Sequence, residues 1–149
     1  MLWLISADFR ANTALETCLG VALVHFYPPK HHLRATRLLN GVLDFDPADV
    51  AARMGRGRIL QAAGDWDAAR NEFQTVMDAT GNVEAQEEVG WCLVKDGKVE
   101  EGREVLETVV ELRDTKAEEN GGGEEKDRAR AWWRLGMAEW TLNGRSRCD

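Results

Sequence analysis

Hydrophobic and small residues recur along this chain with the spacing of helix faces, and the pattern returns after 33 positions. Residues 50–80 can be aligned with residues 83–113 so that six pairs of small or apolar residues coincide, each pair 33 positions apart. The pairs are Gly57 and Gly90, Leu60 and Leu93, Gly64 and Gly97, Ala69 and Gly102, Phe73 and Leu106, and Val76 and Val109. A fixed period of this length predicts a tandem array of helical hairpins.

Helix packing and helix capping explain the residue types at the repeated positions. Gly57 and Gly90 stand inside helical patterns, where glycine costs ~1 kcal/mol relative to alanine, so we expect a close helix–helix approach at each. Gly102 then faces Gly90 from the second helix of the hairpin, and Leu106 fills the groove one turn further on. The glycines expected to end first helices with left-handed caps are Gly64 and Gly97.

The same pattern of small and apolar positions continues before residue 50. In a second helix these positions hold Ala35, Leu39 and Val42, and residues 19–23 form the core of a first helix. We therefore predict an all-α fold: three hairpins of a helical superhelix plus one unpaired C-terminal helix. The expected helices span residues 12–27, 31–45, 48–63, 66–79, 83–96, 99–113 and 126–143.

The chain is expected to divide into four parts: an N-terminal leader (1–11), the repeat array (12–113), an acidic glycine-rich linker or insertion (114–127), and a final helix with a tail (128–149). The final helix has no second helix after it. We expect Trp132 in its core, Trp133 and Trp140 on an exposed face, and the helix to be the least stable part in isolation. These features suggest that the chain is a piece of a longer repeat array.

Charge is unevenly distributed. Residues 1–75 carry eight Lys/Arg and eight Asp/Glu, whereas residues 76–149 carry eleven and eighteen, so the second half accounts for the net charge of −7. An acidic half repels nucleic acid. The basic cluster Lys30, Arg34, Arg37, Arg53, Arg56 and Arg58 is interpreted as a solvated or partner-facing surface, and we expect no direct nucleic-acid binding.

Apolar runs are too short to span a membrane, and Leu19–Tyr27 is interpreted as a buried helix face. The three cysteines form no CxxC motif, which favours the cytosol or nucleus.

The residues expected for catalysis or for binding a cofactor or metal are absent. The adjacent carboxylates Glu87/Glu88, Glu100/Glu101, Glu118/Glu119 and Glu124/Glu125 diverge on a helix, so we expect them on solvated faces. His31 and His32 are consecutive, and no further ligand follows at zinc-binding spacing. No Walker loop, dinucleotide fingerprint or nucleophile elbow occurs. The sequence therefore favours a protein that is not an enzyme and needs no cofactor.

The repeat, with Pro47 at the junction of two units, resembles the tetratricopeptide repeat. Within that class, the segments Leu19–Leu39 and Arg53–Leu60 are similar to fungal versions of the large tetratricopeptide subunit of the superkiller complex. That resemblance implies a cytoplasmic scaffold that holds an RNA helicase and propeller subunits and serves exosome-mediated 3′–5′ mRNA decay.

A co-chaperone-like tetratricopeptide module that binds a terminal carboxylate is the alternative. The basic and asparagine residues of such a clamp are missing, and Glu87 would repel a carboxylate. For either function, partner-binding residues are expected on the first helices: Met54, Arg58, Gln61, Glu87, Trp91, Lys95, Trp133 and Trp140.

Overall fold

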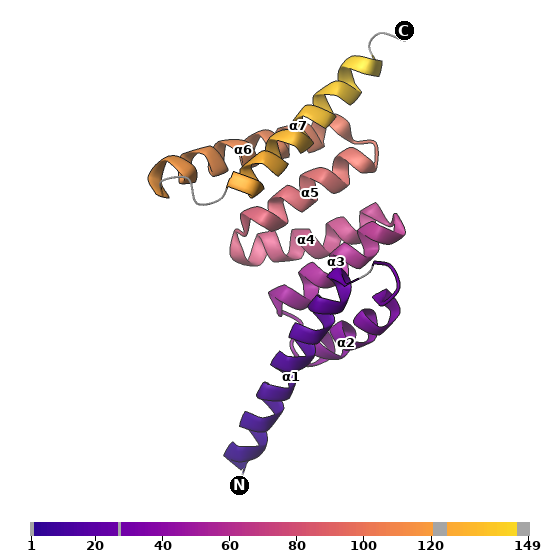
Figure 1. The fold of residues 1–149 in the computed structure, drawn as a ribbon, viewed down its shortest axis with the longest axis vertical. Coiled ribbons are helices and arrows are strands. Elements are labelled where there is room, and N and C mark those ends of the chain that lie inside the picture. Colours follow the sequence, from indigo (N-terminus) through magenta and orange to yellow (C-terminus); the bar gives the residue numbers. More distant parts are fainter. Residues whose placement is uncertain (1, 27, 121–124, 146–149) are drawn as a thin grey trace. The chain divides into compact units, whose positions relative to one another are not determined.

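The computed structural model describes residues 2–26, 28–120 and 125–145, which form seven helices and no strand (Figure 1). The helices are α1 (Leu2–His25), α2 (His32–Phe45), α3 (Val50–Ala63), α4 (Trp66–Thr80), α5 (Val83–Lys95), α6 (Val99–Asn120) and α7 (Glu125–Arg145). The prediction of tandem all-α hairpins is confirmed. Contacts divide the chain into two compact units, residues 1–72 and residues 73–149, with the division inside α4.

Two helices are longer than the sequence pattern predicted. Helix α1 begins at Leu2 rather than near residue 12, and α6 continues past Arg113 to Asn120. Neither extension contains a proline or glycine, the residues that most strongly disfavour a helix interior. Residues 2–11 of the expected leader and residues 114–120 and 125–127 of the expected linker are therefore helical, and residues 1 and 121–124 lie outside the described residues.

The residues that cap the helices recur with the same 33-residue period as the hydrophobic pattern. Asp49 caps α3 by accepting a hydrogen bond from the Ala52 amide at 2.8 Å, and Asn82 caps α5 by accepting one from the Ala85 amide at 3.1 Å. The cap glycines Gly64 and Gly97 have φ of 81° and 92°, a left-handed conformation that costs glycine little. The predicted first-helix caps are confirmed.

The core of the N-terminal unit is organised around Leu39. This side chain is fully buried, and an added Cβ would lie 2.6 Å from it at Gly20 on α1 and 2.9 Å from it at Gly55 on α3. Leu39 of α2 therefore packs into recesses that two glycines leave in the flanking first helices. Ala35 and Val42, expected in the same slots, are also fully buried.

Glycines also allow close packing in the C-terminal unit, where α5 and α6 cross. An added Cβ at Gly90 would approach the Leu106 side chain to 3.0 Å, and one at Gly102 would approach the Gly90 carbonyl oxygen to 2.7 Å. Two helix backbones thus approach each other through two glycines. The predicted facing of Gly90, Gly102 and Leu106 is confirmed.

Helix α7 packs on this hairpin through short side chains. Ala131, Leu135 and Ala138 are buried in one cluster with residues of α6. Trp132 is one position beyond Ala131, roughly 100° around the helix, and it is 51% exposed. The expectation that Trp132 lies in the core was wrong, because the buried stripe runs through the alanines and the leucine.

The glycine crossing predicts opposite effects for two alanine substitutions. We expect Gly102→Ala to lower the free energy of unfolding by about 1–3 kcal/mol, because its Cβ would press against the α5 backbone. The matched control is Gly136→Ala on α7, where an added Cβ meets nothing within 4 Å. That variant is expected to be more stable than wild type by up to about 1 kcal/mol, from helix propensity alone.

Urea denaturation followed by circular dichroism measures both effects. Equal stability changes in the two variants would show that α5 and α6 do not approach each other through these glycines.

Candidate functional site

A buried carboxylate joins the three helices of the C-terminal unit that follow α4. Glu87 of α5 is fully buried. Its carboxylate accepts hydrogen bonds from Arg113 of α6 at 2.7 Å and from Arg130 of α7 at 2.7 Å, and Arg134 Nη1 of α7 lies 3.1 Å away. One anion from α5 therefore binds cations from α6 and from two successive turns of α7.

Further acidic groups balance the arginines. Glu88, which is almost fully buried, accepts hydrogen bonds from Arg134 Nη2 at 3.1 Å and 3.2 Å. Asp127 pairs with Arg130 at 3.2 Å and lies 3.8 Å from Arg113. Together these six residues, which we name the Glu87 cluster, carry three positive and three negative charges. A balanced and hydrogen-bonded network is the arrangement in which buried charges are tolerated.

The sequence-based expectation that Glu87 and Glu88 lie on a solvated face was wrong. Their partners come from helices that the local pattern does not connect to α5. Burial opposes ionisation of Glu87, but the hydrogen bond from Arg130 and the charges of Arg134 and Arg113 outweigh it and hold the pKa below its ordinary value of 4.5. Glu87 is therefore an ionised structural anion at neutral pH and is not positioned to act as a general base.

Beside this cluster, aromatic and cationic side chains form a surface patch from α5 and α7. The Trp91 ring lies 5.5 Å from the Trp133 ring, centroid to centroid, at an interplanar angle of 48°. Lys95 Nζ lies 4.9 Å from the Trp91 centroid, and the Arg134 guanidinium carbon lies 5.4 Å from it, both within cation–π range. The structure thus brings together three of the predicted partner-binding residues: Trp91, Lys95 and Trp133.

Helix α7 exposes two further tryptophan side chains to solvent. Trp133 is 58% exposed, and Trp140, seven positions further on, is 70% exposed. This spacing places the two rings on one side of α7, as predicted. Exposed tryptophans in such an arrangement are characteristic of protein-binding surfaces.

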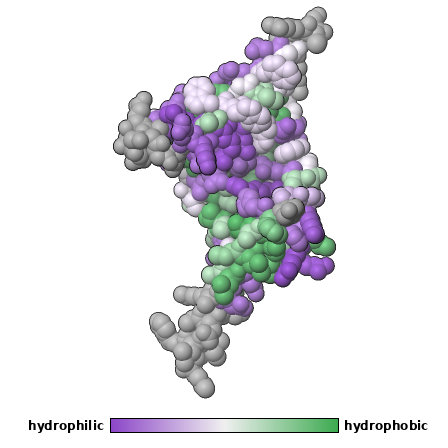
Figure 2. Space-filling view, viewed as in Figure 1, coloured by the Kyte–Doolittle hydropathy of each residue, from purple (hydrophilic) through white to green (hydrophobic). Residues whose placement is uncertain are grey.

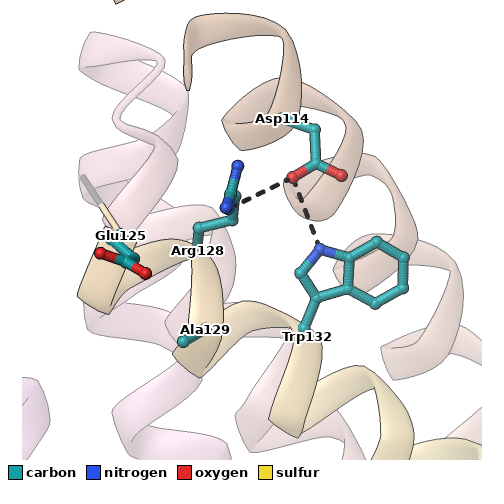
Figure 3. Close-up of a pocket in the computed structure, with 5 residues that line it drawn as sticks. All are labelled: Asp114, Glu125, Arg128, Ala129 and Trp132. Carbon is teal, nitrogen blue, oxygen red and sulfur yellow. Dashed lines mark hydrogen bonds and ion pairs between the residues drawn. The ribbon is translucent and has the colours of Figure 1, made fainter. Parts of the chain in front are cut away.

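Trp132 lines a separate open pocket of about 630 Å³ (Figure 3). The other lining residues are Asp114, Glu125, Arg128 and Ala129. Figure 3 shows Arg128 and the Trp132 indole nitrogen both directed at the Asp114 carboxylate, at 3.9 Å and 3.4 Å. The sequence placed Asp114 in a linker, so this pocket was not predicted.

The predicted residues of the N-terminal unit lie on one side of α3. Met54 is nearly buried, at 9% exposed, while Arg58 and Gln61 are half-buried. Arg58 Nη1 lies 3.4 Å from His25 Nε2 of α1. Among these three, Arg58 and Gln61 have side-chain surface that a partner could contact.

Figure 2 shows hydrophobic surface gathered on the N-terminal unit, whereas the visible face of the C-terminal unit is mainly hydrophilic. Leu15 and Leu19 of α1, four positions apart, and Phe26, which directly follows α1, contribute exposed apolar side chains. The expectation that Leu19–Tyr27 is a buried face holds for Val24, which is 4% exposed, and fails for Leu19 and Phe26.

Among the described side chains, no three His, Cys, Asp or Glu residues form a group that could hold a metal ion. No helix within the described ranges combines the length and apolar character that crossing a bilayer requires. The candidate site consists of the exposed aromatic and charged surfaces on α5, α6 and α7.

Sequence comparison agrees with the hairpin geometry. Residues 30–87 match the sequence model of the tetratricopeptide repeat family. This segment belongs to the tetratricopeptide repeat family. The match covers the segment from the end of the α1–α2 connection to the first half of α5.

One sequence relative and two solved structures are similar to parts of this chain. Superkiller protein 3 of Saccharomyces cerevisiae is 31% identical over 101 residues, which are 66% of this chain and 7% of that protein's length. The Sgt2 tetratricopeptide domain from Aspergillus fumigatus has a TM-score of 0.70 at 18% identity, covering 91% of this chain and 82% of that domain. The MamA RS-1 ArsTM double mutant has a TM-score of 0.61 at 18% identity, with coverages of 87% and 76%. Both structural similarities show a shared fold.

The Glu87 cluster predicts an acid-sensitive stability. At neutral pH, Glu87→Gln should cost about 3–5 kcal/mol, because it leaves three arginines without their shared anion. Since the folded-state pKa of Glu87 is lowered, its stabilising effect is complete above the ordinary value of 4.5 and is lost as the pH falls through the lower folded value. The stability difference between wild type and variant should therefore shrink below about pH 4.5.

Thermal and urea unfolding between pH 3 and pH 7 measure this dependence, with the exposed Glu101→Gln on α6 as the matched carboxylate control. A Glu87→Gln variant as stable as Glu101→Gln at neutral pH would be inconsistent with the cluster described above.

Proposed function

We propose that this chain is a non-catalytic protein-interaction scaffold of a superkiller-type complex that serves cytoplasmic, exosome-mediated 3′–5′ mRNA decay. The observation that carries this proposal is the 31% identity with superkiller protein 3 over 101 residues, together with the tetratricopeptide match. The chain spans 7% of that relative's length, so the role proposed here is that of one interaction segment.

The site chemistry supports binding rather than catalysis. Tetratricopeptide arrays present side chains of packed helices as extended surfaces for other proteins. Here the Trp91–Trp133 pair and Trp140 supply large, rigid contact area, and tryptophan is among the residues most enriched at binding hot spots. Two carboxylates of α5, Glu87 and Glu88, are already paired with arginines of α7.

The charge distribution supports a protein partner rather than RNA. In the N-terminal unit, Arg53 and Arg56 of the basic cluster both pair with Glu72, at 3.2 Å and 2.6 Å. These ion pairs reduce the positive charge available for phosphates. The C-terminal half carries the chain's whole excess of negative charge.

The partners proposed are the RNA helicase and the propeller subunit of such a complex. We propose that Trp91, Lys95, Trp133 and Trp140 contact them from the C-terminal unit, and Arg58 and Gln61 from the N-terminal unit. Purified fungal helicase and propeller proteins should then co-elute with this chain in size-exclusion chromatography.

Trp140→Ala is the sharpest test of the surface, because this side chain is 70% exposed and its loss should leave the core intact. Losing a tryptophan hot spot costs about 2 kcal/mol or more, so we expect binding to the partner to weaken roughly 30-fold. The matched control is Leu33→Ala on α2, also strongly exposed at 69%, which should bind normally.

Isothermal titration calorimetry with each purified partner measures the difference. Binding of chaperone C-terminal peptides in place of the helicase and propeller would support the co-chaperone alternative and contradict the superkiller-type role. Tight, salt-sensitive binding of RNA by the chain alone would contradict the protein-scaffold proposal.

A further inference from the structure

We propose that the pocket beside Trp132 docks an arginine or lysine side chain of a partner protein. This inference rests on the scaffold function proposed above and names the chemistry that one of its surfaces recognises. The pocket belongs to α6 and α7 and does not include Trp91, Lys95, Trp133 or Trp140.

The aromatic wall of the pocket suits a cation. Trp132 is 51% exposed, and in Figure 3 its indole nitrogen is directed at Asp114 while the rest of the ring extends away from that carboxylate. An indole face attracts a guanidinium or ammonium group placed over it more strongly than other aromatic faces do. An apolar ligand would also contact the ring but would form no ion pair with Asp114 or Glu125.

The acidic residues favour the same occupant. Asp114 and Glu125 line the pocket from α6 and from the first turn of α7. A cation resting on Trp132 would bring a charge-assisted donor close to Asp114. The net charge of −7 in residues 76–149 would attract a basic segment from a distance and repel an acidic one.

Arg128, which also lines the pocket, shows that Asp114 can pair with a guanidinium group. Its Nε lies 3.9 Å from Asp114 Oδ1, the limit of an ion pair, and its side chain is 43% exposed. The Trp132 indole bond to the same oxygen is also long, at 3.4 Å. Asp114 therefore holds both partners loosely and can accept a shorter, charge-assisted hydrogen bond from an incoming guanidinium.

The test uses the full chain, labelled with ¹⁵N, and follows the indole N–H signal of Trp132, assigned with a Trp132→Phe variant. The probe is a short blocked peptide that alternates arginine and glycine. Two matched peptides replace arginine by citrulline, which keeps the shape without the charge, or by glutamate.

We expect the arginine peptide to shift the Trp132 signal, with an affinity that falls as salt is added. The citrulline peptide should bind roughly 10-fold more weakly, because it lacks the ion pairs. The double variant Asp114→Asn/Glu125→Gln should weaken arginine-peptide binding by roughly 5-fold to 10-fold, and Trp132→Ala by ~3-fold. Glu139→Gln, an exposed α7 carboxylate outside the pocket, should leave binding unchanged.

An equal response to the glutamate peptide, or an unmoved Trp132 signal, would overturn the proposal. A Trp132 shift that appears on concentrating the chain without peptide would also overturn it, by identifying a second copy as the occupant. If the helicase or propeller binds the double variant as tightly as wild type, the docking proposal fails while the scaffold function stands. If neither protein binds wild type, the scaffold function itself fails.

Discussion

The arrangement of the C-terminal unit depends on one buried anion. Glu87 lies on α5 with no exposed surface, and its carboxylate is shared by Arg113 of α6 and by Arg130 and Arg134 of α7. Removing the Glu87 carboxylate would leave its three arginines without the anion that they share, which costs far more than the intact ion pairs contribute. The network thus requires the three helices to adopt this arrangement, and the exposed side chains of α7 are placed by it.

Packing around α7 explains why such a network is needed. The buried stripe of this helix consists of two alanines and a leucine, which supply little apolar area, while its large tryptophans face outward. The helix therefore exposes its bulky aromatic side chains, and the ion pairs of the Glu87 cluster add to its limited apolar packing. This arrangement leaves the tryptophans of α7 accessible to a partner. In α6, by contrast, the large apolar side chains Leu106 and Val109 are fully buried.

The sequence predicted the features that recur and missed those that occur once. Gly90, Gly102 and Leu106 could be placed because their equivalents lie 33 positions earlier, and a period supplies the register of helices in contact. Trp132 was misplaced because one position along a helix turns a side chain by roughly 100°, and the stripe through Ala131 and Leu135 was a weak hydrophobic signal.

The Glu87 cluster could not be predicted, because Arg113 and Arg130 lie 26 and 43 positions from Glu87 and no local pattern links them. For the same reason the Asp114 pocket was missed, since it forms only when α6 continues beyond its predicted end and meets α7. Both features depend on tertiary packing that a periodic pattern does not encode.

Amide hydrogen exchange along α7, compared between wild type and Glu87→Gln at neutral pH, measures whether the buried anion holds this helix in place. In wild type, amides from Ala131 to Ala138 should be protected to a degree similar to those of α5, because the Glu87 cluster and the apolar contacts with α6 hold α7 on the hairpin. The sequence pattern alone predicted the opposite, that the final helix is the least stable part. In the variant these amides should exchange about a hundredfold faster or more, while α5 and α6 retain more of their protection. Unchanged protection of α7 in Glu87→Gln would show that the buried anion does not hold this helix in place.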